Sequence, residues 1–155
     1  MKPLLKALGH VSIVVKDLDV MIKKYTDDYG VEPWTVMDLN PEIVKSQTIH
    51  EKPVEYSYRA ALCNIGNVKL ELIQPQDDKS LYAKFLKEHG EGVHHCAFIV
   101  DDYEKFGEKM KDKGFEVLMG GNINGLKFAY YPTHEELGVV IETYDIPKDL
   151  ETNNQ

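Results

Sequence analysis

The sequence predicts an α+β protein made of two tandem copies of one strand–helix–strand–strand–strand unit. A short apolar run headed by a histidine occurs twice, at residues 10–15 and 95–100, and an aspartate follows each run within two residues. Such runs are typical of buried strands, and the aspartate is a common first residue of a helix. Two later apolar runs, residues 68–75 and 139–145, each contain one glutamate. This matching order indicates a duplicated unit.

The elements of the first unit follow from its hydrophobic pattern. After the strand at 10–15, apolar residues recur at three- and four-residue spacing from Leu18 to Tyr25, which predicts a helix at 17–28. Gly30 is a suitable C-cap for that helix. We expect the rest of the unit to be a strand at 34–39, a polar surface excursion at 42–52, and a hairpin of strands at 54–64 and 68–75.

The second unit repeats this order after a connecting helix at 81–89. We expect a strand at its start, a helix at 103–113, a loop at 120–125, and strands at 115–119, 126–131 and 138–144. The domain organisation is therefore a first module at 8–75, a connecting helix and linker at 76–92, a second module at 93–146, and a flexible polar tail at 147–155.

Composition narrows the class of protein. The chain has 155 residues, 43% of them apolar and 28% charged, which is ordinary globular usage. Its net charge of -8 argues against nucleic acid as a partner, because phosphate binding requires a basic surface. No apolar run approaches the roughly 20 residues of a membrane-spanning helix, so we expect no membrane association and a cytoplasmic location. Cys63 and Cys96 have no partner at metal or redox spacing, and we expect reduced buried thiols.

The repeated polar residues are His10 with His95 and Glu71 with Glu142. Imidazole nitrogens and carboxylate oxygens together suit a divalent ion such as Co, Ni, Zn, Mn or Fe. Taken alone, each residue is more often an ordinary strand histidine or a solvated glutamate. Their recurrence at matching places in both halves favours a shared metal site, with two coordination positions left open for substrate oxygens.

The remaining histidines are less suited to the site. His94 precedes His95 and should point to the opposite face of a regular strand, because side chains alternate. His50, His89 and His134 fall in predicted loops or at a helix end, where we expect solvated side chains.

These segments resemble the vicinal oxygen chelate superfamily, which includes glyoxalase I, methylmalonyl-CoA epimerase, extradiol dioxygenases and the bleomycin resistance proteins. The resemblance covers about residues 8–146 and is closest to methylmalonyl-CoA epimerases. It implies that the two βαβββ modules curl into an open, cup-shaped mixed sheet with helices outside, and that the metal ligands are His10, Glu71, His95 and Glu142. The segments that carry it are GHVSIVVKDL from Gly9, GNVKLELI from Gly66, GEGVHH from Gly90, and the last hairpin with FAYYP and GVVIE.

The resemblance also implies the chemistry. A metal that chelates two oxygens of a carbonyl substrate stabilises the enolate formed when the adjacent carbon loses its proton. Glu142 would then be both ligand and base. The family has a further carboxylate on the third strand of the first unit, and counting back from Glu71 reaches Glu55 as the second base. The residues around Glu55, and the aromatic set Trp34, Tyr56, Tyr58 and Tyr130, depart from the family pattern.

Three functions are consistent with this sequence. The first is a metal-dependent epimerase or isomerase acting beside a carbonyl, with methylmalonyl-CoA as the thioester that the resemblance suggests. The second is a glyoxalase I-like lactoylglutathione lyase, which would use the same ligand set. The third is a non-catalytic protein that binds a small molecule in the cup. Because both enzyme families that the sequence resembles are usually dimers, we expect a homodimer.

Overall fold

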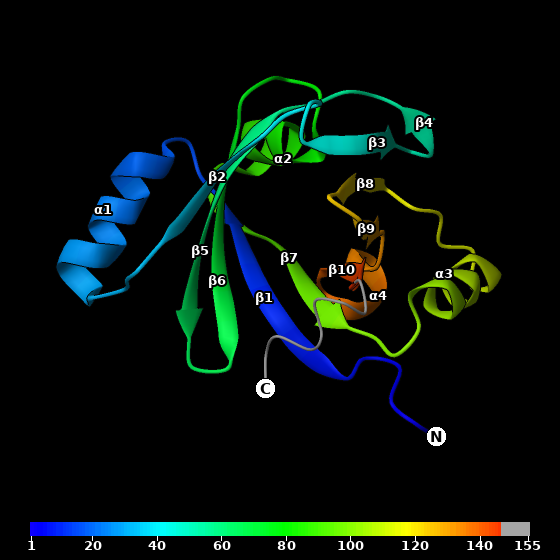
Figure 1. Ribbon diagram of the computed structural model, residues 1–155. Helices are drawn as coiled ribbons and strands as arrows, with labels where there is room; N and C mark the ends of the chain where they lie inside the picture. The colour runs from blue at the N-terminus through cyan, green and yellow to red at the C-terminus, as the bar shows by residue number, and fades with distance from the viewer. Residues whose placement is uncertain (147–155) are drawn as a thin grey trace.

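The computed structural model describes residues 1–146, and in them ten strands form a single mixed sheet accompanied by four helices (Figure 1). The sheet is strongly curled, which confirms the predicted cup-shaped α+β fold (Figure 1). The predicted tail at 147–155 lies outside the described residues. The strand order is β2-β5-β6-β1-β7-β10-β9-β8-β3-β4.

The strands and helices have the following bounds. The first half contains β1 (Ala7–Val14), α1 (Leu18–Tyr29), β2 (Thr35–Leu39), β3 (Val44–Ile49), β4 (Lys52–Pro53), β5 (Tyr58–Ile65) and β6 (Val68–Pro75). The connecting helix is α2 (Leu81–His89). The second half contains β7 (Gly92–Ile99), α3 (Tyr103–Asp112), β8 (Met119–Ile123), β9 (Leu126–Tyr131), α4 (His134–Leu137) and β10 (Val140–Asp145).

The duplication is visible in how the central strands pair. In each half the first strand runs parallel to the last, β1 with β6 and β7 with β10. The two halves join through antiparallel pairing of β1 with β7. Each half also starts its helix in the same way: Asp17 and Asp102 accept hydrogen bonds from the backbone N–H of Val20 and Lys105. These are N-caps, which explains why the aspartates mark the helix starts in the sequence.

The predicted surface excursion at 42–52 is wrong. It forms β3 and β4, and β3 pairs with β8 of the second half. Residues 40–43 connect β2, at one edge of the sheet, to β3, next to the other edge. A link of that length spans less than about 18 Å, so the sheet curls far enough to bring its two edges close together. The excursion thus joins the two halves of the cup.

Two other boundaries differ from the prediction. The strand expected at 54–64 begins only at Tyr58, and the strand expected at 115–119 lies instead at 119–123. Both shifts have the same cause, because strand ends are set by the neighbouring strand and not by local hydrophobicity. Met119 to Ile123 pair with both β9 and β3, and residues 115–117 have no strand partner among the described residues.

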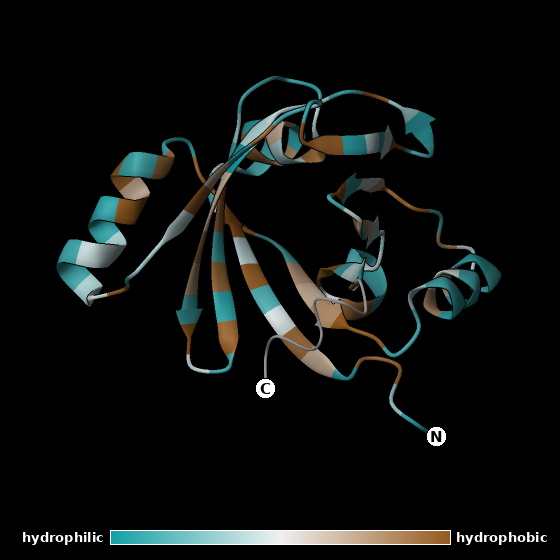
Figure 2. Ribbon diagram, viewed as in Figure 1, coloured by the Kyte–Doolittle hydropathy of each residue, from teal (hydrophilic) through white to brown (hydrophobic). Residues whose placement is uncertain are grey.

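Apolar residues cover both faces of the sheet, and Figure 2 shows the resulting bands of polar and apolar residues along β1 and β6. On the outer face, α1 packs against the first half and α3 against the second (Figure 1). The largest core cluster lies on the inner face and combines residues of both halves with Tyr82 of α2. Its members are Val14, Leu39, Val44, Tyr56, Tyr58, Ala60, Ile73, Tyr82, Met119, Phe128 and Tyr130.

Candidate metal centre

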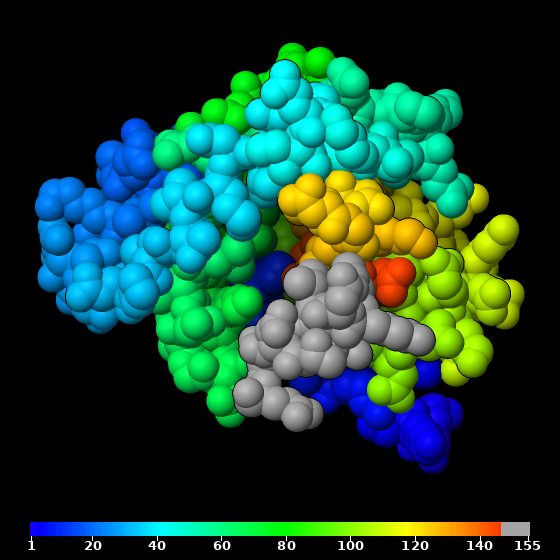
Figure 3. Space-filling view, viewed as in Figure 1, coloured from blue at the N-terminus to red at the C-terminus, as the bar shows by residue number. Residues whose placement is uncertain are grey.

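The four predicted ligand residues lie on four adjacent strands in the middle of the sheet. Glu71 is on β6, His10 on β1, His95 on β7 and Glu142 on β10, and these strands are neighbours in that order. The duplication therefore places one histidine and one glutamate from each half around the β1–β7 junction. In Figure 3 a recess opens beside the green β5–β6 hairpin, with dark blue atoms of the N-terminal region at its base.

The donor atoms of these side chains converge. Nε2 of His10 lies 3.3 Å from Nε2 of His95. Oε1 of Glu71 lies 3.4 Å and 3.6 Å from the same two nitrogens, and Oε2 of Glu142 lies 3.0 Å from both. All four side chains are largely buried, with exposed fractions of 8% for His10, 12% for Glu71, 0% for His95 and 5% for Glu142. Two imidazoles and two carboxylates thus share one small volume that is nearly inaccessible to solvent.

This arrangement fits a divalent ion. Ligands at about 2.0–2.2 Å from a metal lie about 3.0 to 3.5 Å from one another in octahedral or tetrahedral geometry, which matches the separations of the two histidine nitrogens from each other and from the glutamate oxygens. The ligand atoms of His10, Glu71 and His95 all lie within 4.8 Å of one another, and Glu142 adjoins this group through its contacts with both histidines. Oε2 of Glu142 is buried and accepts no well-aligned hydrogen bond from any residue in 1–146, although both histidine nitrogens are near. A buried carboxylate oxygen without a hydrogen bond is rare unless another partner, such as an ion, satisfies it.

The charges in the cluster compensate one another when no ion is present. Burial by itself lowers the pKa of His95, but the carboxylates of Glu142 and Glu71 outweigh it and raise the pKa to about 9. Burial likewise raises the pKa of Glu142, but the charge of His95 overcomes this effect and lowers it to about 2. The pKa of His10 is raised by Glu71 and Glu142 in spite of burial. At neutral pH the cluster therefore carries protons that an incoming cation must displace.

His94 does not point to the opposite face, contrary to the prediction. Its Nδ1 lies 2.9 Å from Nδ1 of His95, and its ring packs against Tyr82 and Phe85. In the pairing of β1 with β7, Ser12 faces His95 and Ile13 faces Val93, so His94 is the extra residue of a β-bulge. A bulge interrupts the alternation of side chains. His94 can therefore contact the back of a ligand ring.

The first half has the same irregularity at the equivalent place. Leu8 faces Phe98 and His10 faces Ala97, so Gly9 is the extra residue there. The repeat aligns Gly9 with His94, and each directly precedes a ligand histidine. The sequence contains no separate signal that places His94 beside the centre, because both bulges are seen only in the pairing of β1 with β7.

Tyrosines surround the centre. The hydroxyl of Tyr144 lies 2.5 Å from Nδ1 of His10, and that of Tyr130 lies 3.4 Å from Nε2 of His95 and 2.6 Å from the hydroxyl of Tyr82. Burial is the main reason that the pKa of each of these three phenols is raised. They are therefore neutral hydrogen-bonding groups at physiological pH. Only Tyr130 belonged to the aromatic set singled out in the sequence.

The structure does not bring Glu55 together with the four ligand residues. It is exposed, precedes β5, and within residues 1–146 makes no hydrogen bond or ion pair to any of them. Its neighbour Tyr56 is the residue turned inward, because the side chain of Gln47 bonds both the N–H and the C=O of Tyr56. The assignment of Glu55 relied on a strand at 54–64, but β5 begins only at Tyr58, after Glu55.

The inner face of β5 also lacks a carboxylate. Tyr58, Ala60 and Leu62 occupy that face, since Ala60 pairs with Ile73 and Leu62 pairs with Glu71. The third strand of the first unit was expected to carry a second carboxylate. Among the described residues, Glu71 and Glu142 are the carboxylates that contact the two histidines.

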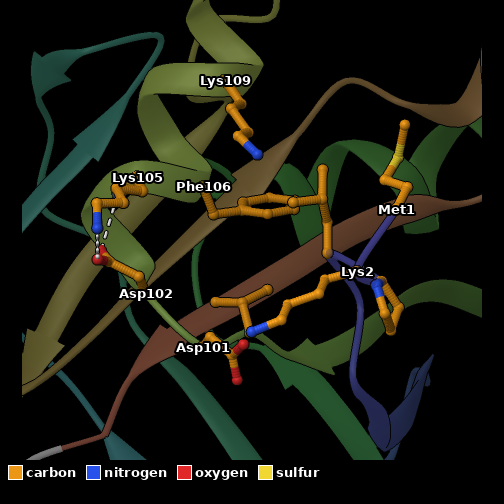
Figure 4. Close-up of a pocket in the computed structure, with 10 residues that line it drawn as sticks. Met1, Lys2, Asp101, Asp102, Lys105, Phe106 and Lys109 are labelled. Carbon is orange, nitrogen blue, oxygen red and sulfur yellow. Dashed lines mark hydrogen bonds and ion pairs between the residues drawn. The ribbon is translucent and has the colours of Figure 1, made fainter.

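Two surface pockets lie away from this centre. One, of about 440 Å³, is formed by the N-terminal residues and α3, with Lys2, Lys105, Lys109 and Phe106 on its walls (Figure 4). The other, of about 330 Å³, is lined by Pro41 and residues 44–47 and 53–55, including Glu55. Neither is lined by any of the four ligand residues.

No described helix is long and apolar enough to cross a bilayer.

The fold and the centre together define a class of protein: a duplicated βαβββ cup with two histidines and two glutamates at its middle. The chain belongs to the glyoxalase/bleomycin resistance protein/dioxygenase superfamily, whose sequence profile matches residues 9–130. The resemblance stated from the sequence is confirmed.

Two curated relatives are 27% identical to this chain. One is the ethylmalonyl-CoA/methylmalonyl-CoA epimerase of Cereibacter sphaeroides, over 115 residues covering 74% of this chain and 75% of that protein. The other is the uncharacterized protein YqjC of Bacillus subtilis, over 123 residues covering 75% and 88%.

Solved structures with the same fold include methylmalonyl-CoA epimerases. The enzyme of Mycobacterium tuberculosis superposes with a TM-score of 0.74 at 24% identity, covering 98% of this chain and 95% of that one. A methylmalonyl-CoA epimerase in complex with methylmalonyl-CoA and NH4+ superposes with a TM-score of 0.70 at 27% identity, covering 90% of this chain and 94% of that one.

Proposed function

We propose that the protein is a metal-dependent isomerase that removes a proton from the carbon next to a carbonyl group. The observation that carries this proposal is the convergence of the four side chains at a buried centre inside the cup, where the Nε2 atoms of His10 and His95 lie 3.3 Å from each other and 3.0–3.6 Å from an oxygen of each glutamate. Similarity to methylmalonyl-CoA epimerases supports the reaction type. His10, Glu71, His95 and Glu142 would hold the ion, which would act as a Lewis acid on a carbonyl oxygen.

Proton transfer is assigned to Glu142. A carboxylate has two oxygens, so one can bind a cation while the other accepts a proton. Burial raises the pKa of Glu142, but in the metal-free protein His95 and His10 lower it to about 2, so its carboxylate is ionised at neutral pH. A bound ion would favour the ionised form in place of the histidine protons. An ionised carboxylate is in the protonation state that a general base requires.

An acyl-CoA thioester such as methylmalonyl-CoA is the substrate class that the relatives suggest. The test is deuterium uptake from heavy water into methylmalonyl-CoA, measured by mass spectrometry with the protein loaded with Co²⁺. We expect uptake that depends on Co²⁺ and disappears in E142Q, while E55Q, which removes a carboxylate outside the centre, keeps the activity. Absence of exchange with Co²⁺, Zn²⁺, Ni²⁺ and Mn²⁺ alike would exclude this thioester.

A second function is favoured by the inner face of β5, which carries Tyr58, Ala60 and Leu62 in place of a carboxylate. An epimerase removes a proton from one face of a carbon and returns it to the other, which requires two proton-transferring groups. A glyoxalase-type isomerisation moves a proton between adjacent carbons, for which one base is enough. Turnover of the methylglyoxal–glutathione hemithioacetal, with no exchange into methylmalonyl-CoA, would assign the protein to this second reaction.

The non-catalytic alternative is tested with protein purified without chelator, and the homodimer with metal-loaded protein. A binding protein would retain its small molecule without turnover and would contain no metal when purified without chelator. The homodimer and the cytoplasmic location remain predictions. Sedimentation equilibrium of the metal-loaded protein measures its oligomeric state directly.

A further inference from the structure

A pair of tyrosines connects the wall of the cup to the candidate centre. Tyr130 lies on β9 in register with Glu142 on β10, so the two side chains are neighbours on the inner face. The hydroxyl of Tyr130 lies 3.4 Å from Nε2 of His95 and 2.6 Å from the hydroxyl of Tyr82. Both phenols are almost completely buried, with exposed fractions of 2% for Tyr130 and 0% for Tyr82. Tyr82 comes from α2, the helix that connects the two modules.

Each phenol has one proton, which limits how the pair can bond. When His95 uses Nε2 as a metal ligand, that nitrogen no longer accepts a hydrogen bond. If Tyr82 then donates to Tyr130, the proton of Tyr130 is left without an acceptor beside the centre. A buried donor of this kind needs a partner, since leaving it unpaired costs about 1–3 kcal/mol. An oxygen of a ligand bound at the centre would then provide an acceptor.

The packing restricts where that proton can point. The ring of Tyr130 lies edge-on to His95 and to Tyr82, with ring centroids 4.6 Å and 6.1 Å apart, and Phe128 packs against it as well. Rings held in this way have few alternative rotamers, so the hydroxyl stays close to the centre without rearrangement. Preorganised donors are the ones that stabilise developing negative charge most effectively.

We propose that Tyr130, held in place by Tyr82, donates a hydrogen bond to the substrate oxygen on which negative charge develops during proton removal. This inference rests on the proposed function, because it requires a ligand with oxygen donors at the same centre. It assigns to a phenol on β9 part of the stabilisation of that charge, and it gives α2 a direct role in the site. It also favours planar, anionic, oxygen-chelating ligands over neutral apolar ones.

Oxalate is a suitable probe, because it is a planar dianion that chelates metal ions through two oxygens. Co²⁺-loaded wild-type protein and Y130F are titrated with oxalate by calorimetry, and the visible absorption of Co²⁺ reports binding at the ion. A hydrogen bond to a charged oxygen implies that Y130F weakens oxalate binding about 10- to 100-fold, with the Co²⁺ affinity unchanged. We expect Y82F to weaken it in the same direction but less, since Y82F leaves the donor in place.

Y56F is the matched control. Tyr56 also belongs to the largest core cluster on the inner face, but its hydroxyl donates to the carbonyl of Gly120. We expect it to bind oxalate like the wild type. A second measurement does not depend on any variant folding: proton NMR of the Zn²⁺-loaded wild type should show a buried phenol hydroxyl that moves downfield when oxalate binds.

The outcomes separate this inference from the function on which it rests. If Y130F binds oxalate within about twofold of wild type, or if no hydroxyl resonance moves, the role of Tyr130 is wrong and the metal centre stands. If the wild type binds Co²⁺ but no oxalate, the role is equally excluded. If the wild type binds neither Co²⁺ nor Zn²⁺, the proposed function fails together with this inference.

Discussion

The Nε2 atoms of His10 and His95 lie 3.3 Å apart, although 85 positions separate the two residues in the chain. Two imidazoles this close and this deeply buried need a shared partner. Glu142 lies 3.0 Å from both nitrogens and Glu71 within 3.6 Å of both. The relationship follows from the duplication, because β1 and β7 are equivalent strands that pair with each other across the middle of the sheet.

Removing either histidine should strongly weaken metal binding. Changing an outer partner of a ligand typically costs 10- to 100-fold in affinity, so H10A and H95A should each lower Co²⁺ affinity by more than about 100-fold. Isothermal titration calorimetry with Co²⁺ measures this. H89A is the control, because His89 is 63% exposed on α2. Unchanged affinity in H10A or H95A would contradict the assigned ligand set.

Metal binding should release protons and strengthen as pH rises. The pKa of His95 in the metal-free protein is raised to about 9 by Glu142 and Glu71 against the effect of burial, so a proton must leave before the nitrogen can ligate. The apparent Co²⁺ affinity should therefore increase from pH 6 toward about pH 9. Calorimetry in buffers of different ionisation enthalpy counts the released protons. Binding without proton release at pH 7 would contradict the proposed role of His95.

The same shifts predict how the stability of the metal-free protein depends on pH. His95 has a raised folded pKa, so its contribution is complete below its ordinary value of 6.5 and is lost as the pH rises through about 9. Glu142 has a lowered pKa, so its contribution is present above 4.5 and is lost as the pH falls through about 2. Both contributions are complete between about pH 4.5 and 6.5, so thermal unfolding of chelator-treated protein should give its highest midpoint in that range. A midpoint that rises steadily from pH 6.5 to 9 would contradict the burial of a protonated His95.

His94 should orient His95. The Nδ1 atoms of the two rings are 2.9 Å apart, and burial lowers the pKa of His94 to about 3, so His94 is neutral and its Nδ1 can accept a hydrogen bond from the Nδ1–H of His95. H94F keeps the aromatic packing but removes the acceptor, and we expect Co²⁺ affinity to fall about 10- to 100-fold. H94Q, which retains an acceptor, should restore part of the affinity. Equal behaviour of the two variants would indicate that the ring serves only for packing.

Gly121 should be required for the closure of the cup. A Cβ atom there would lie 2.8 Å from Cζ of Phe128 and 2.9 Å from Cγ1 of Val44, inside the cluster that joins β3 to β8. Overpacking of this kind costs about 1–3 kcal/mol, so G121A should unfold at lower urea concentration. Gly9 is the matched control, because a Cβ there meets nothing closer than 3.5 Å. Equal midpoints for G121A and G9A would show that the two strands adjust freely.

Much of this arrangement could be predicted from the sequence, because it depends on local pattern and on the duplication. Asp17 and Asp102 mark the helix starts, and the repeated histidine and glutamate positions indicate which four side chains meet. Both kinds of information are carried by residues close together in the chain or related by the repeat.

The features that were not predicted depend on contacts between distant segments. Residues 42–52 have a polar, irregular pattern because β3 lies next to the edge of the sheet. Its partner β8 belongs to the other half of the chain. His94 reaches the centre through a bulge, which no alternation pattern indicates. Tyr82 joins the site because α2 packs against the inner cluster, and its position relative to Tyr130 is set entirely by tertiary structure.

X-ray absorption of the protein loaded with one equivalent of Zn²⁺ tests the central claim most directly. If His10, Glu71, His95 and Glu142 hold one ion, the spectrum should contain scattering from two imidazoles with nitrogens at about 2.0–2.1 Å and from carboxylate oxygens at about 2.0–2.2 Å. One imidazole contribution should disappear in H95A. A spectrum without imidazole scattering, or one identical in wild type and H95A, would show that these four side chains do not form the metal centre.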